Sequence, residues 1–445
     1  MAPKKSQKQE EEMHFISSDT DLFTEPGVDI TILNTNEVTY HAQNNLADKS
    51  APLSFFIPGN DSQYINTAEC NLFLRCKIVD GKGADYGPTA DKAKYTYAPI
   101  NNLIHSMFKS VDIKLKDTQI THNNCYYPYR AYMEKQLSYG KNYKKTQGEA
   151  GMFYKTKSEK NTTDDGWVRR ETEVSSSKPF ELYGRPHSEL FSQTRLLIPG
   201  VDIRVDFVRS PDAFCIQTAG TDKGLHSPQL IILEAKLLVT KHTIRPSLAL
   251  NHAALIQSGH HVVYPSRENE MKAYVIAKGE HQNTNETLLS GVLPDRIVLG
   301  FVNSEHIHGT YASNPLIFED FGVSHITVAL NSDVQTVKHM DLDFAKNRFT
   351  QAYMSIFEGL GIANTDVCID INKEEFKSGG KTLFVYDLQH TRDAYTPALR
   401  GNVSIDLKFN TALPHSITVM CYAEYQSVLY INRDKQVSKK DYSQD

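Results

Sequence analysis

The feature that most limits how this chain can fold is a strand followed by a short helix. Apolar and polar residues alternate through VDIKLK, residues 111–116, and a period of two with one apolar face predicts a half-buried strand. Pro128 can begin a helix because the first turn does not need its missing N–H, and Gly140 predicts the helix end. Between them the apolar residues share one helical face: Tyr129, Tyr132, Met133 and Leu137.

This strand–helix unit recurs in the second half of the chain. Three pairs of segments match in the same order, and colinear matches that include a helix between strands indicate a duplication. The chain is therefore predicted to be all-β, with two consecutive eight-stranded antiparallel sandwiches that each contain a short inserted helix. The pairs are FKSVDIKL (108–115) with FGVSHITV (321–328), AYM (131–133) with AYM (352–354), and VDIRVDF (201–207) with VSIDLKF (403–409).

Local patterns place the other elements of the second half. An apolar helical face that runs from Phe349 to Phe357 predicts a second helix, which Gly359 or Gly361 can end. Runs of alternating or apolar residues predict the strands. These strands are Met271–Ala277, Arg296–Val302, Val323–Leu330, Thr382–Tyr386, Val403–Phe409 and Ile417–Ile431.

Length and composition bound the class of protein. Sandwiches often run to about 200–250 residues, so 445 residues suit two of them. A net charge of −5 argues against a protein that coats nucleic acid with its whole surface. The six cysteines form no CxxC pair, and neither an apolar leader nor an apolar run of about 18 residues is present. We therefore expect reduced thiols, no cofactor and no transmembrane segment.

The pattern changes divide the chain into four parts. Residues 1–20 are predicted to be a flexible N-terminal arm, whose Lys4, Lys5 and Lys8 could contact nucleic acid or a neighbouring subunit or could simply be solvated. Pro246 follows a strand and marks the joint between the sandwiches. The predicted parts are the arm, a first sandwich at 21–245 with long loops at about 80–99 and 141–178, a second sandwich at 246–432, and a flexible tail at 433–445.

The segment 141–178 is rich in Lys, Ser, Thr and Gly, and two tyrosines lie among its cations. Such a mixture could bind nucleic acid by charge and stacking, but Glu149, Glu159, Asp164 and Asp165 dilute the charge, and we favour a solvated surface loop. The residues of this candidate patch are Lys141, Lys144, Lys145, Lys155, Lys157 and Lys160, with Tyr143 and Tyr154.

One candidate metal motif remains. Gly300 lies six residues before His306, and His306-Ile-His308 could place two imidazoles on one side of a strand, as in cupin enzymes. The first following carboxylate is Glu319, beyond Pro315, which is too distant for the usual ligand set. No nucleophile elbow, HExxH sequence or phosphate-binding glycine loop is present. We expect no catalytic, cofactor-binding or metal site and no enzyme activity.

Several blocks, in the same order, resemble the major capsid proteins of Polinton (Maverick) elements and adintoviruses, which belong to the hexon-like double jelly-roll lineage of adenoviruses and tectiviruses. The resemblance covers nearly the whole chain outside the two tails and 141–178. The blocks are IHSMFKSVDIKLKDTQITHNNCYYPYRAYMEKQLSYG, FSQTRLLIPGVDIRVDF, KHTIRPSLALNHAALIQSGHHVVYP, LPDRIVLGFVNSEHIHGTYASNPLIFEDFGVSHITVAL, LFVYDL and LKFNTALPHSITVMCYAEYQSVLYI.

The resemblance implies two jelly rolls per chain and a homotrimeric, pseudo-hexagonal capsomer of an icosahedral shell. Its implied partners are neighbouring capsomers, a single jelly-roll vertex (penton) protein, other minor capsid proteins and an enclosed double-stranded DNA that is bound without sequence specificity. The expected location is the virion, after synthesis in the host cytoplasm, with the nucleus as a further candidate place of assembly. The alternatives are a domesticated jelly-roll binding module and a cupin-like metal enzyme at His306 and His308.

Overall fold

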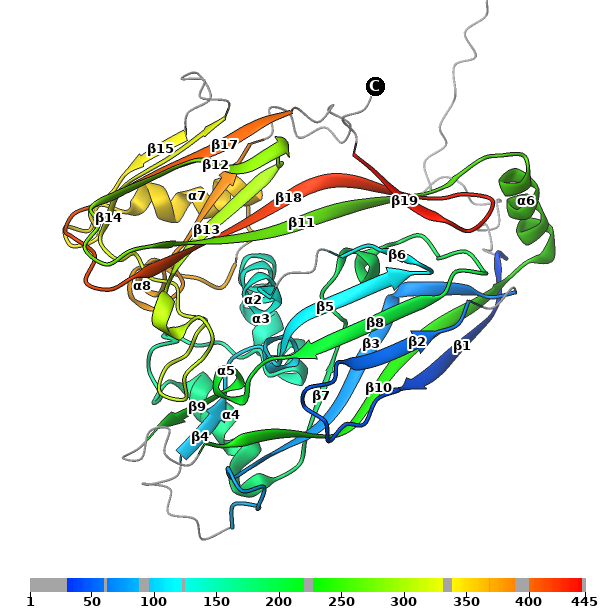
Figure 1. The fold of residues 1–445 in the computed structure, drawn as a ribbon, viewed down its shortest axis with the longest axis horizontal. Coiled ribbons are helices and arrows are strands. Elements are labelled where there is room, and N and C mark those ends of the chain that lie inside the picture. Colours follow the sequence, from blue (N-terminus) through cyan, green and yellow to red (C-terminus); the bar gives the residue numbers. More distant parts are fainter. Residues whose placement is uncertain are drawn as a thin grey trace, which may run out of the picture.

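The fold is taken from a computed structural model, which describes residues 30–59, 62–87, 96–121, 125–219, 227–330, 338–367, 369–388 and 400–441. The proposed arm at 1–20, with Lys4, Lys5 and Lys8, lies outside the described residues. The structure is mostly β and consists of two antiparallel sandwiches with some of the helices between them (Figure 1).

The first sandwich is built from strands β1 to β10. One sheet has the order β1-β10-β3-β7 and the other has the order β2-β8-β5-β6. All of these neighbours pair antiparallel. The strands are β1 (Ile32–His41), β2 (Leu53–Ile57), β3 (Tyr64–Val79), β5 (Phe108–Leu115), β6 (Thr118–Gln119), β7 (Phe180–Gly184), β8 (Ile203–Arg209) and β10 (Gln229–Ile244).

The second sandwich repeats this topology strand for strand. Its sheets have the orders β11-β18-β13-β16 and β12-β17-β14-β15, so in each sandwich the first strand pairs with the last and the second with the last but one. This is the strand order of a jelly roll. The strands are β11 (Val262–Ile276), β12 (Gln282–Val292), β13 (Arg296–Asn303), β14 (Val323–Leu330), β15 (Lys338–Asp341), β16 (Leu383–Asp387), β17 (Arg400–Phe409) and β18 (Ile417–Ile431).

Short helices and one ribbon complete the described chain. The two-stranded ribbon joins β4 (Thr96–Pro99) to β9 (Ile216–Ala219). The helices are α1 (Leu103–Ser106), α2 (Tyr127–Ser138), α3 (Lys141–Lys144), η1 (Gln147–Gly151), α4 (Asp165–Val174), η2 (Ser175–Ser177), η3 (Glu189–Ser192), α5 (Asp212–Cys215), α6 (Pro246–Gln257), η4 (Ser304–His306), α7 (Thr350–Leu360) and α8 (Lys373–Ser378).

The duplicated strand–helix unit is confirmed by the topology. β5 and β14 are equivalent strands, and α2 and α7 both lie between the fifth and sixth main strands of their sandwich. α7 ends at Gly361, whose φ of 72° places it in the left-handed region that favours glycine. Gly140 has φ −82° and instead precedes α3, so its predicted role as a glycine cap of α2 is wrong.

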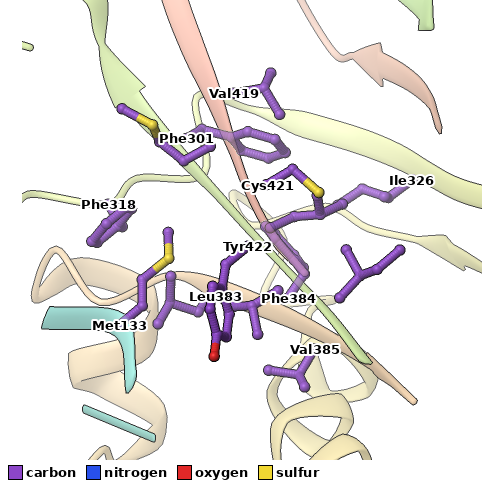
Figure 2. Packing of buried hydrophobic residues seen from close by; sticks show 14 of the residues in the cluster. Met133, Phe301, Phe318, Ile326, Leu383, Phe384, Val385, Val419, Cys421 and Tyr422 are labelled. Carbon is purple, nitrogen blue, oxygen red and sulfur yellow. The ribbon is translucent and has the colours of Figure 1, made fainter. Parts of the chain in front are cut away.

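The alternating residues fill the cores as expected, but α2 does not serve only its own sandwich. Val111, Ile113 and Leu115 are buried in the first core. The apolar face of α2 (Tyr129, Tyr132, Met133 and Leu137) belongs to the core cluster of the second sandwich. Figure 2 shows Met133 of α2 among side chains of the second half, including Phe318 and Leu383. α2 therefore packs between the two sandwiches.

Two segments predicted to be irregular carry regular structure. The segment 141–178 contains α3, η1, α4 and η2 and buries Phe153 and Trp167, so it is not a solvated loop. The C-terminal tail forms β19 (Val437–Asp441), which pairs with β18 because Val437 supplies an apolar anchor that is only 6% exposed. Of the other predicted loop, at about 80–99, residues 96–99 form β4, and residues 88–95 lie outside the described part.

Candidate functional site: the junction between the sandwiches

The junction is made by segments that leave one sandwich and dock on the other. The Tyr129 hydroxyl of α2 donates a hydrogen bond to the Ile307 carbonyl at 3.0 Å. The Thr218 N–H of β9 donates to the Tyr311 carbonyl at 2.7 Å. The loop after β13 is thereby fixed to the first sandwich by backbone contacts.

Glu159 is the centre of a buried polar network at this junction. It is 4% exposed, and its Oε1 accepts hydrogen bonds from Asn101 Nδ2 at 3.0 Å, Tyr132 hydroxyl at 2.9 Å and Thr156 Oγ1 at 2.5 Å. Its Oε2 accepts from Asn314 Nδ2 of the second half at 3.1 Å. Both carboxylate oxygens therefore have donors, which removes much of the cost of burying the charge.

Two buried cations stabilise the Glu159 charge. Burial alone would raise the pKa of Glu159, but Arg170 and Lys381, with the hydrogen bonds from Thr156 and Asn101, lower it overall. Arg170 is 2% exposed and Lys381 is 1% exposed. Since Arg170 comes from α4 and Lys381 from the second half, one carboxylate connects the cations of both halves.

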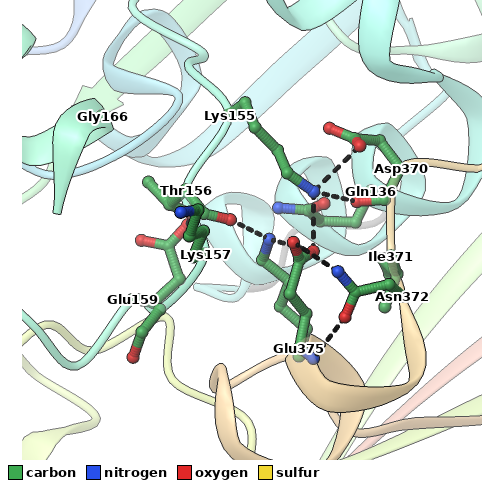
Figure 3. Close-up of polar contacts among 12 residues, drawn as sticks. Gln136, Lys155, Thr156, Lys157, Glu159, Gly166, Asp370, Ile371, Asn372 and Glu375 are labelled. Atoms are coloured by element: carbon green, nitrogen blue, oxygen red, sulfur yellow. Dashed lines mark hydrogen bonds and ion pairs between the residues drawn. The ribbon is translucent and has the colours of Figure 1, made fainter.

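A second set of ion pairs lies beside Glu159 and also crosses the junction. Figure 3 shows Lys155 of the first half between two carboxylates of the second, with its Nζ 2.8 Å from Asp370 Oδ1 and 2.7 Å from Glu375 Oε2. Lys381 Nζ lies 3.2 Å from the same Glu375 oxygen and donates to the Thr156 carbonyl at 2.5 Å. These pairs fix the segment 141–178 to the region around α8.

A third cluster lies at the other side of α2. Arg130 Nε is 3.3 Å from Glu134 Oε1, and Glu134 also contacts His187 Nε2 and accepts from Asn269 Nδ2 of β11 at 3.3 Å. Burial would raise the pKa of Glu134, but His187 and Arg130 lower it to about 2. The cluster therefore keeps an ionised carboxylate between α2, the loop after β7, and the second sandwich.

A groove of about 1070 Å³ opens beside this cluster, between α2, the chain after β7, and strands β11 and β18. Lys135 lines it and is 7% exposed, with its Nζ 5.6 Å from the centre of the Phe153 ring. Burial, with a smaller contribution from Arg185, lowers the pKa of Lys135 to about 7.

Replacing Lys135 with methionine is expected to raise the free energy of unfolding at pH 7, by on the order of 2 kcal/mol, because the folded state disfavours the charged amine. The gain should shrink as the pH rises. Between pH about 7 and 10.5 the unfolded chain holds a proton on Lys135 that the folded chain lacks. The free energy of unfolding of the wild type therefore increases with pH over this range.

Urea unfolding of both proteins at pH 7.0 and 9.5 measures this difference. Lys141→Met, at an exposed position of the neighbouring α3, is the control and should give no pH-dependent difference. A gain for Lys135→Met that is the same at both pH values would show that only packing changed.

The residues singled out from the sequence are placed differently from those expectations. β13 ends at Asn303, so His306 and His308 follow it in a 3₁₀ turn and loop instead of alternating along a strand. His306 Nδ1 lies 3.1 Å from Ser313 Oγ. The geometry assumed for a cupin site is therefore wrong, and this loop instead packs on the first sandwich.

The candidate cation patch is also not assembled on one surface. Lys144 is buried and donates to Gln136 Oε1 at 2.6 Å, Lys155 pairs across the junction, and Lys160 pairs with Glu319. Tyr154 is buried as well. The nucleic-acid interpretation of this segment therefore loses half of its cations to internal contacts.

The described residues lack two further features. Within these ranges no group of three or more His, Cys, Asp or Glu side chains is arranged to hold a metal ion. No helix in this part of the chain is long and apolar enough to span a membrane.

Comparisons with known proteins show which fold this chain shares. No protein-family model matches the chain. An uncharacterized protein of Caenorhabditis elegans, F54H12.2, is 24% identical over 418 residues, which cover 92% of this chain and 97% of that protein.

Among solved structures, a chain of the Sputnik virophage matches with a TM-score of 0.67 at 9% identity, over 100% of this chain and 94% of that one. The mavirus major capsid protein matches with a TM-score of 0.56 at 10% identity, over 99% and 96%. The PBCV-1 virus capsid matches with a TM-score of 0.53 at 8% identity, over 94% and 98%. The fold of this chain is thus the double jelly-roll fold of major capsid proteins.

Proposed function

We propose that this chain is a major capsid subunit, three copies of which form a pseudo-hexagonal capsomer. One observation carries the proposal: the chain contains two sandwiches with the same strand order, held together by ion pairs and hydrogen bonds across their junction. Three such chains would present six similar sandwiches around one axis, and closed rotational symmetry of this kind is usual for soluble oligomers. A fixed angle within each chain is needed for that outline to close.

The matched proteins support this proposal and its location in a virion. The mavirus match is itself a major capsid protein and the PBCV-1 match is a virus capsid, and both cover nearly the whole length of the two chains. Full-length similarity at this level favours a structural role over a catalytic one. The partners that follow are neighbouring capsomers, a penton protein at the vertices, minor capsid proteins and an enclosed double-stranded DNA.

We further propose that the gene belongs to the Polinton and adintovirus group. The support is the series of sequence blocks described above together with the nematode relative, 97% of whose length is covered by the match. A relative encoded by an animal favours an element resident in a host genome over a free virus. We keep the division at Pro246 as the proposed boundary between the two jelly rolls.

The assembly state of the purified protein tests the proposal. The chain has a mass of 50.3 kDa, so size-exclusion chromatography with light scattering should give about three times that mass, or larger shells. Negative-stain images of the trimer should show a six-lobed outline. A monodisperse monomer at micromolar concentration would contradict the proposal, and so would a stable dimer, which cannot place six sandwiches around one axis.

A further inference from the structure

An exposed apolar surface lies at the end of the molecule where the two sandwiches are connected. Figure 1 shows α6 at this end, close to the beginning of β1. Five large apolar side chains from α6, β1 and the residues just before β1 are between 43% and 70% exposed. This surface, called here the α6 patch, consists of Ile30, Ile32, Leu33, Leu250 and Leu255.

α6 has one attached face and one apolar free face. Leu248 and Ala249 pack against the first core, and His252 Nδ1 lies 2.9 Å from the Tyr64 hydroxyl of β3. On the opposite face, Leu250 is 70% exposed, and Ala254, one turn further on, is exposed as well. A surface helix normally turns polar residues to water, so a helix that is docked by one face and carries exposed apolar residues on the other indicates an interaction site.

We propose that residues 13–23 of the same chain cover the α6 patch. These residues, MHFISSDTDLF, supply five apolar side chains: Met13, Phe15, Ile16, Leu22 and Phe23. The Thr31 carbonyl accepts a hydrogen bond from the Arg245 N–H at 2.9 Å, one residue before α6 begins. The chain that precedes Ile30 therefore starts next to the first turn of α6.

The length of the connecting chain and the charges of residues 13–23 are both compatible with this segment covering the α6 patch. Seven residue steps separate Phe23 from Ile30 and can span up to about 24 Å, whereas the 12-residue α6 is about 18 Å long. The segment carries Asp19 and Asp21, and α6 has no acidic residue to repel them, while Arg245 beside it is exposed. The proposal does not depend on the capsid assignment.

Protection of an engineered thiol tests the proposal in the full chain. Leu250→Cys is placed in a Cys125→Ser, Cys368→Ser background, which removes one exposed thiol and one outside the described residues, while the other four cysteines are buried. Its maleimide labelling should become at least tenfold faster when Phe15, Leu22 and Phe23 are all changed to Ser. Val275→Cys, at a position 60% exposed on β11, is the control. It should label at the same rate whether residues 13–23 are wild type or carry the three Ser substitutions.

Two further measurements, disulfide formation and labelling with added vesicles, identify the occupant. Oxidation of a Phe15→Cys, Leu250→Cys protein should give a disulfide within one chain on a non-reducing gel. A disulfide between two chains would overturn the proposal in favour of a neighbouring copy. Equal labelling rates with and without the apolar side chains would overturn it, as would protection of Leu250→Cys that arises only when phosphatidylglycerol vesicles are added.

Discussion

Changing Glu159 to glutamine is expected to lower the free energy of unfolding by about 3–5 kcal/mol, the usual cost of leaving a buried charge without compensation. The carboxylate is 4% exposed and faces Arg170 and Lys381, which are almost completely buried. With a neutral amide in its place, Arg170 would lose its largest compensating charge in a nearly inaccessible region, whereas Lys381 would keep its ion pair with Glu375. The loss should therefore come mainly from the Arg170 charge left behind and not from the glutamine.

The same segment offers a matched control. Glu149 Oε1 lies 3.1 Å from Arg169 Nη1, but the two side chains are 36% and 63% exposed. Surface pairs of this kind contribute about 0–1 kcal/mol, so Glu149→Gln should change stability little. Trp167, the only tryptophan, lies in α4 and is buried, so its fluorescence during urea unfolding reports directly on this segment. Equal losses for the two variants would contradict the role given to Glu159.

The pH dependence of the Glu159 effect has a definite sign. Its folded pKa is lowered from the ordinary value of 4.5, so its stabilising contribution is complete above pH 4.5 and is lost as the pH falls through the folded pKa. The difference between wild type and Glu159→Gln should therefore be constant at pH 6–8 and decrease below pH 4.5. A difference that grows on acidification would mean that the carboxyl is neutral in the native state.

Local periodicity was sufficient for much of the fold. The alternation at 111–116 and the apolar face of α2 predicted a strand and a helix correctly, because both follow from residues close in the sequence. The order of the matched segments then predicted the duplication. β12 was missed because its sequence QNTNETLLSGV is largely polar and lacks alternation, and it lies at the edge of its sheet.

The junction could not be predicted in the same way. Glu159, Lys155 and Lys144 lie in a polar segment whose sequence suggests a solvated loop, yet each is neutralised or hydrogen-bonded by a residue that is distant in the sequence. Lys155, for example, pairs with Glu375, 220 residues later. Such partners leave no local pattern. The apolar face of α2 indicated that the helix is buried, but periodicity does not say against which sheet.

Gly309→Ala is expected to be the most damaging small substitution in the loop that follows β13. Gly309 has φ +87°, which costs a residue with a side chain about 1 kcal/mol, and an added Cβ would lie 2.3 Å from Phe214 Cα and 2.5 Å from Phe214 N. These are backbone atoms of α5 in the first sandwich and cannot rotate away. Overpacking against fixed atoms adds about 1–3 kcal/mol, so the total loss should be about 2–4 kcal/mol.

Gly279→Ala separates the cost of the backbone conformation from the cost of the steric clash. Gly279 has a similar φ of +90°, but no atom lies within 4 Å of its added Cβ, so it should lose only the conformational part, about 1 kcal/mol. The difference between the two variants in urea unfolding is then the cost of the clash. Equal losses would show that the loop yields freely and does not fix the junction.

Hydrogen exchange shows which part of the molecule is destabilised in Gly309→Ala. If the loop is displaced, the Thr218 N–H loses its acceptor at Tyr311, and its hydrogen exchange should accelerate in Gly309→Ala but not in Gly279→Ala. Amides in the centres of β10 and β18 should stay protected, because each sandwich keeps its own core. A variant with two intact sandwiches and a loosened junction would also test the proposed capsomer: if a fixed angle is required, Gly309→Ala should fail to form trimers that Gly279→Ala still forms.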